Sequence, residues 1–543
     1  MKIILPEAAK GFKFDLLYTI DMNDFDVEML LPMLFHMVRT KGKPVGKAND
    51  PLKFDEYFEQ LRQHHRIADF DAPRSRRLLK RWLRTSVVKI GKVGRSGRGE
   101  QILFVYPRTL LAYKAGLPKD ITRLRGTHRF LYYILLENAK DPVQLENLFT
   151  ACFGDGVSFT QGMAFDGRYD DKTDVDIETL LSFCFLDQLT AAGIRHYRPS
   201  EDQKIGPRLT HQSTVFAQDV LALLRCYRGE LSTALLIGMT AGLINLHFFV
   251  YTMRLVRYVL RAVQGEASVR SHKLYVDCTG ERRSYSDELA RGCVERDLGE
   301  LEMYMRASLR LRTLNRYIQS NQRLRPQLPP DTSAPEYLKK LVELQHSMEV
   351  ENKAEMEFDD ICKLNQPDAE DEQMTDDAQF LASLKDQQFE WSLDRTLEVL
   401  FRAHRSSALG NLGGWFYAVG GYNRPYGLIS GNVRGVRVAR YALTNELLSI
   451  LVHAALANGG PNGTSVTRMS LRDFLRTLEE RYGILIDKPP AFDRSVEASE
   501  AARRNLSAFK VRLRQIGVFR SLSDDFGAQY IHRPATQKAV AAC

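Results

Sequence analysis

The stretch that most constrains the fold is Arg74–Pro107, because a helical periodicity in it is followed directly by a strand periodicity. Ten Lys or Arg residues and no Asp or Glu lie between Arg74 and Arg98. At about 100° per residue, the basic side chains of the first half fall on one arc of a helix and the apolar ones on the opposite arc. The basic arc holds Arg76, Arg77, Lys80, Arg81 and Arg84, and the apolar arc holds Leu78, Leu79, Trp82 and Leu83.

The second half of this stretch predicts a β-hairpin. Val87–Val93 is rich in β-branched residues, a glycine-rich turn follows, and Gln101–Tyr106 returns with apolar residues. A basic helix before a basic-tipped hairpin is the order of a winged helix, in which the helix enters a DNA groove. The alternative is a solvated basic helix beside an ordinary hairpin. The hairpin residues that we expect to contact the nucleic-acid backbone are Lys89, Lys92, Arg95 and Arg98.

Residues 441–534 predict a second winged helix. Helices are expected at Thr444–Ala457, Ser470–Tyr482 and Glu497–Ile516, followed by a short hairpin of Phe519–Leu522 and Ala528–Ile531. The hairpin tip is acidic, so this second module favours a protein partner more strongly than the first module does. The basic residues expected to contact nucleic acid here are Arg503, Arg504, Lys510 and Arg514.

The segment Leu231–Met253 contains no charged residue and is long enough to cross a membrane. Polar residues interrupt it, however, and arginines flank it on both sides. We therefore expect a buried central helix in a large helical core. A membrane-associated effector that uses this segment is one alternative function.

Carboxylates gather in the loop between Gly154 and Glu178. Asp170, Asp171 and Lys172 match half of a metal-dependent nuclease signature, with Asp155 or Asp166 as the further acid. A nuclease that uses the Asp155–Lys172 loop is a second alternative, and a capped, solvated loop is the simpler interpretation. The sequence contains no P-loop, zinc-ligand spacing or hydrolase motif. We accordingly expect a non-enzymatic protein without metal or cofactor. A catalytic Cys–His pair formed by residues far apart in the sequence stays an open alternative.

Two further segments have biased composition. Glu349–Asp377 carries twelve Asp or Glu residues against two Lys, which predicts an exposed, partly disordered stretch that acts as a linker or shields a basic surface. Gly410–Gly435 holds eight glycines among aromatic residues. It predicts tight turns and a partner-docking loop, with a stacking surface for bases as the alternative. The expected partner contacts are Trp415, Tyr422 and Tyr426.

The fold class that these patterns indicate is mainly α with small β-hairpins, in a multidomain chain with winged-helix modules near both ends around a helical core. A length of 543 residues suits two to four domains. Seven irregularly spaced cysteines and the lack of a signal-peptide pattern predict free thiols and a cytoplasmic setting. The predicted bounds are an N-terminal arm at 1–25, a winged helix at 26–110, a helical core at 111–325, a Pro-rich and acidic linker with a helix at 326–395, a Gly/aromatic segment at 396–440, a second winged helix at 441–534 and a tail at 535–543.

Three C-terminal segments carry a resemblance to a known group of proteins. They are RVARYALTNELLSILVHAAL (437–456), LRDFLRTLEERYGILID (471–487) and NLSAFKVRLRQIGVFRSLSDDFGAQYIHRP (505–534). Over this last quarter the chain resembles uncharacterised accessory proteins of bacterial methylation-associated, anti-phage defence systems. The resemblance implies a defence role beside ATPase, modification or restriction subunits. Together with the basic modules, it predicts a non-enzymatic scaffold subunit of a defence complex that binds double-stranded DNA and no membrane.

Overall fold

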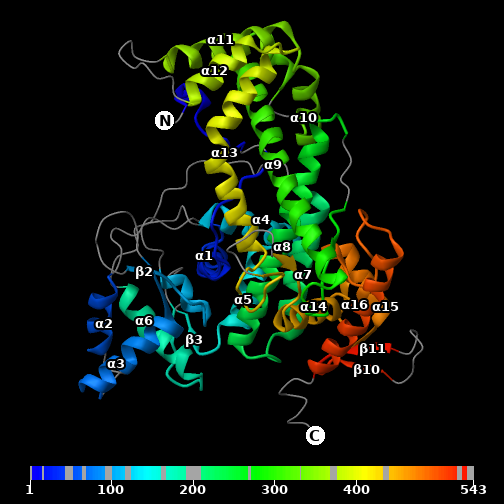
Figure 1. Ribbon diagram of the computed structural model, residues 1–543. Helices are drawn as coiled ribbons and strands as arrows, with labels where there is room; N and C mark the ends of the chain where they lie inside the picture. The colour runs from blue at the N-terminus through cyan, green and yellow to red at the C-terminus, as the bar shows by residue number, and fades with distance from the viewer. Residues whose placement is uncertain are drawn as a thin grey trace.

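The computed structural model describes residues 3–14, 17–42, 53–63, 69–91, 101–115, 124–159, 167–190, 209–266, 271–329, 332–366, 376–431, 439–521 and 529–534. Figure 1 shows helices gathered around one long central bundle, with short strands at its periphery. The predicted class, mainly α with small β-hairpins, is confirmed.

The centre of the bundle is α8, Thr233–Ala262. It packs against α7 (Thr210–Tyr227), α9 (Tyr285–Ser320), α13 (Ser392–Val419) and α14 (Asn445–Ala457). Among the described residues it is the one helix long and apolar enough to cross a membrane, a test that buried core helices also pass. In its most apolar window 78% of the residues are buried, as expected for a central core helix.

The elements not yet named complete the layout. In the N-terminal half they are α1 (Val27–Arg39), α2 (Phe54–Arg62), α3 (Pro73–Trp82), β1 (Val88–Gly91), β2 (Gln101–Val105), α4 (Thr127–Ala139), α5 (Pro142–Phe153), β3 (Val157–Ser158), β4 (Arg168–Tyr169) and α6 (Ile177–Thr190). Then follow β5 (Leu274–Tyr275), α10 (Ala334–Glu343), α11 (Met348–Leu364), α12 (Asp376–Asp386), β6 (Ile429–Ser430), β7 (Arg440–Tyr441), β8 (Arg468–Ser470), α15 (Leu471–Thr477), β9 (Ile484–Leu485), α16 (Val496–Gln515), β10 (Phe519–Ser521) and β11 (Gln529–His532).

The predicted helix and hairpin of the N-terminal module are both present. A π-turn, Leu83–Val87, connects α3 to β1, which pairs antiparallel with β2. Side chains of α2, α3, this hairpin and α6 form one hydrophobic cluster. Helix α1 contributes instead to the central core, where it packs against α4 and α8. The three helices therefore do not share one core, and a winged helix at 26–110 stays a prediction.

The C-terminal module follows its predicted element order closely. Thr444 caps α14 by accepting the Leu447 amide at 3.1 Å, and Ser470 caps α15 by accepting the Asp473 amide at 3.0 Å. The strands form one antiparallel sheet in the order β10-β11-β8. The sequence did not predict β8. This order suits a winged helix, and that assignment also stays a prediction.

The acidic stretch is more ordered than the sequence predicted. Residues 348–364 form α11, which packs against α13, so the prediction of partial disorder is wrong there; residues 367–375 lie outside the described part. Ile3, Leu5 and Ala9 of the N-terminal segment are buried in one hydrophobic cluster with side chains of α11, α12 and α13. Its backbone at Ile4 exchanges two hydrogen bonds with the Asn365 side chain, at 2.8 and 2.9 Å. The two predicted segments 1–25 and 326–395 therefore contact each other (Figure 1).

The carboxylate of Asp219 on α7 connects the core to the C-terminal module. Asp219 is fully buried and accepts hydrogen bonds from His247 at 3.0 Å, Arg481 at 2.5 Å, Tyr482 at 2.8 Å and Asn458 at 2.7 Å. Burial alone would raise the pKa of Asp219, but hydrogen bonds and charge from His247 and Arg481 lower it. The carboxylate is thus held ionised at the junction of α7, α8, α14 and the turn after α15.

Replacing Asp219 with Ala should therefore destabilise the whole protein. The change leaves the Arg481 charge without its partner, a loss that typically costs about 3–5 kcal/mol. Urea unfolding followed by circular dichroism measures it, with Asp359→Ala on the exposed side of α11 as the control. Equal unfolding midpoints for the two variants would show that Asp219 does not hold the junction.

Candidate functional site

The predicted basic arc of α3 divides into two parts. Arg76 forms an ion pair with Glu59, and Lys80 bonds Asp55 at 2.5 Å, both on α2. Arg84 stacks over the Phe54 ring at 4.8 Å. This part of the arc therefore packs against a neighbouring helix, and it is less available for nucleic acid than the sequence predicted.

The second part of the arc faces solvent. Arg74, Arg77 and Arg81 are exposed at i, i+3 and i+7 of α3 and form no ion pair with any described residue. Leu78 lies among them and is 66% exposed, so its predicted place on the core face is wrong. Leu79 and Leu83 are fully buried, as predicted. We call Arg74, Arg77, Leu78 and Arg81 the α3 face.

One of the four predicted hairpin contacts lies among the described residues. Lys89 lies half-buried on β1, whereas Lys92, Arg95 and Arg98 lie outside the described residues. On α16, Arg503, Arg504 and Arg514 are exposed and Lys510 is half-buried. Arg504 approaches Glu500 at 3.7 Å, and Arg514 stacks over Phe519 at 5.6 Å. Of these exposed arginines, Arg504 is therefore the one whose charge is partly offset by a carboxylate of the same helix.

The glycine and aromatic segment does not form the exposed loop that the sequence predicted. Helix α13 continues through Gly410, Gly413 and Gly414 as far as Val419. Trp415 is 0% exposed and donates to the Thr252 hydroxyl of α8 at 3.0 Å. Tyr426 is also buried, and Tyr422 is half-buried. The predicted exposure is wrong for Trp415 and Tyr426, and partner contact by these residues stays untested.

The Asp-rich loop uses its carboxylates to hold its own turns. Asp170 accepts the amides of Lys172 and Thr173 at 2.9 and 3.0 Å and the Thr173 hydroxyl at 2.6 Å. Asp155 instead accepts the Thr233 hydroxyl at 2.6 Å, and Asp166 lies outside the described residues. No group of three potential metal-binding side chains occurs within the described ranges. The geometry fits the capped-loop interpretation and gives the nuclease alternative no support.

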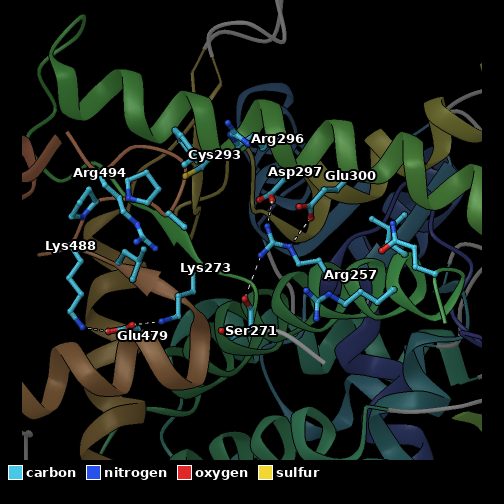
Figure 2. Close-up of a pocket in the computed structure, with 18 residues that line it drawn as sticks. Arg257, Ser271, Lys273, Cys293, Arg296, Asp297, Glu300, Glu479, Lys488 and Arg494 are labelled. Atoms are coloured by element: carbon cyan, nitrogen blue, oxygen red, sulfur yellow. Dashed lines mark hydrogen bonds and ion pairs between the residues drawn. The ribbon is translucent and has the colours of Figure 1, made fainter. Parts of the chain in front are cut away.

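A cleft that the sequence did not predict lies between the end of α8, α9 and the segment 485–494 (Figure 2). Its volume is about 620 Å³. Six Lys or Arg side chains and three carboxylates line it. They are Arg257, Arg261, Lys273, Arg296, Lys488 and Arg494, with Asp297, Glu300 and Glu479. No local motif signals this site, because its walls come from separate parts of the chain, at 257–264, 271–273, 293–300, 479 and 485–494.

Asp297 forms the buried floor of the cleft. It accepts His272 Nε2 at 2.9 Å and the Tyr441 hydroxyl at 2.6 Å. Cys293 lies one turn earlier on α9, and burial raises the pKa of its thiol to about 12. A thiol with such a pKa is a poor nucleophile at neutral pH. Cys293 and His272 therefore do not supply an activated Cys–His pair.

Cys293 should accordingly resist alkylation in the folded protein. With its pKa near 12, little thiolate forms at pH 8, and burial keeps the reagent away. Iodoacetamide labelling followed by peptide mass spectrometry measures this, with labelling in urea as the control. Native labelling at the rate seen in urea would reopen a catalytic role for Cys293.

These observations define the class of the protein: a largely helical protein with exposed arginines on α3 and α16 and a polar, cation-rich cleft beside α9. Comparison with known proteins then identifies the family. The chain belongs to the family described as methylation-associated defense system protein MAD7, whose model matches residues 7–534. The match covers nearly the whole chain, not only the C-terminal quarter that carried the resemblance. No curated protein and no solved structure matches the sequence.

Proposed function

We propose that the chain is a non-enzymatic, cytoplasmic subunit that binds double-stranded DNA and assembles with other components of its defence system. Family membership supports the role in defence. DNA binding and scaffolding are the further steps that we propose.

The proposal of DNA binding rests on the α3 face. Three exposed arginines at one helix face, without acidic partners among the described residues, suit phosphate contacts. The exposed arginines of α16 add a second basic helix. Figure 1 shows α3 at the end of the molecule opposite to α11 and α12, whose sequences are acidic. Such separation of charge favours approach of DNA from the basic end.

The decisive experiment compares two double variants of α3 that remove equal charge. Arg77→Ala with Arg81→Ala removes two exposed cations and should reduce the slope of log K against log salt by about two. Arg76→Gln with Lys80→Gln removes two cations that α2 already binds. It should leave the slope almost unchanged. The measurement is a salt titration of duplex binding by fluorescence anisotropy.

Thermal melting shows whether each variant is folded. Equal slopes for the wild type and a folded Arg77→Ala/Arg81→Ala variant would remove the α3 face from the DNA interface. The face would then be assigned to an acidic protein partner.

Co-purification with co-expressed components of the same defence system tests the scaffold role. The Arg77→Ala/Arg81→Ala variant should retain those partners, since α3 lies outside the central core.

A further inference from the structure

The cleft beside α9 is a preformed site, because hydrogen bonds near both ends hold the segment 486–493, which forms its outer wall. Asn505 of α16 is fully buried and donates to the carbonyls of Val276 and Ile486, at 2.9 and 3.0 Å. At the other end of the wall, Asp493 accepts the Tyr285 hydroxyl at 2.7 Å. The segment between Ile486 and Asp493 is thereby fixed to α9 and α16. A rigid wall lowers the entropic cost of binding a ligand.

The cleft has a surplus of positive charge. Glu300 accepts Arg257 at 2.8 Å, and Glu479 is shared by Lys273 and Lys488, the latter at 2.5 Å. Asp297 is occupied by His272 and Tyr441. Arg296 and Arg494 are exposed and form no ion pair within the described ranges. Two guanidinium groups are thus available, and guanidinium binds phosphate oxygens through paired hydrogen bonds.

A flat surface lies beside these cations. The Arg296 guanidinium stacks over the Phe492 ring at 4.2 Å from its centroid, and Phe492 is 39% exposed. The ring rests on α9 where Gly292 leaves room, since a Cβ there would meet the ring at 3.2 Å. An Arg–Phe stack of this kind accepts a further aromatic ring on its free side.

We propose that this cleft binds a free nucleotide, with its phosphates on Arg296 and Arg494 and its base against the Phe492 stack. The volume of about 620 Å³ lies within the range of roughly 300–1,000 Å³ that is typical of small-molecule sites. The site is separate from the α3 face. It lies between α9 and residues 485–494 of the C-terminal module.

The test is isothermal titration calorimetry of the full chain with ATP, GTP and inorganic phosphate. Arg296→Gln with Arg494→Gln should weaken ATP or GTP binding by at least about tenfold, since each charge-assisted hydrogen bond contributes roughly that factor. Arg503→Gln with Arg504→Gln removes equal charge from α16 outside the cleft and should leave binding unchanged. Phe492→Leu should weaken the nucleotide about fivefold or more and leave phosphate unaffected, because only the base stacks.

Three results would overturn the proposal. One is the absence of ATP and GTP binding at millimolar concentration. Another is an equal loss in both arginine double variants, which would indicate general charge attraction. The third is a 5′-phosphorylated single strand that binds this cleft while free nucleotides do not. Duplex affinity of the Arg296→Gln/Arg494→Gln variant is measured in parallel. It should match the wild type, so that failure here is distinguishable from failure of DNA binding by α3.

Discussion

The buried carboxylate of Asp219 is the interaction on which the arrangement of this protein depends. Its partners Arg481 and Asn458 lie 262 and 239 residues away in sequence, yet both donate to it directly. Asp297 repeats the pattern with His272 and Tyr441. A carboxylate buried this deeply is stable only when all its donors are in place. The C-terminal module is therefore fixed to the central helices, and the direction in which α16 presents its arginines is fixed with it.

Pairing between carboxylates and cations also explains why counting charges in the sequence overestimates the number of cations that are free to bind a ligand. On α3, Arg76 and Lys80 are partners of carboxylates that lie one turn apart on α2. These pairs are partly exposed and contribute little to stability, but they occupy cations that a sequence pattern counts as free. The arginines of the α3 face and the pair Arg296 and Arg494 are among the exposed cations that form no such pair with a described residue. They are better candidates for ligand contacts than a run of basic residues as a whole.

Much of the local structure could be predicted from the sequence, because the signals for it are local. The helices of the C-terminal module, their caps at Thr444 and Ser470 and the β1–β2 hairpin follow from periodicity and hydrogen-bonding side chains. The course of α13 could not be predicted from glycine content, because burial of Trp415 and Phe416 against α8 outweighs the low helix propensity of its glycines. The spacing of Leu412, Trp415, Phe416 and Val419 was the available signal.

The candidate sites were less predictable than the fold. Which cations of α3 stay exposed depends on α2, a helix that the sequence pattern treats separately. The cleft depends on the end of α8, on α9, on residues 271–273 and on residues 479–494, which meet only in the folded chain. Strand β8 was missed for a related reason, since it has three residues and is defined by its pairing with β11. Contacts between distant segments carry no periodic signal, so sequence patterns cannot show them.

The contacts of the acidic segment indicate that it has a structural role. Glu351 accepts the backbone amide of Ser392 at the start of α13 at 2.6 Å, and Glu357 pairs with Arg316 of α9. These carboxylates hold α11 and α13 to the long helix α9, at the end of the molecule far from α3 and α16 (Figure 1). Charges so placed cannot cover the basic helices, so the described part of the segment does not support a shielding role.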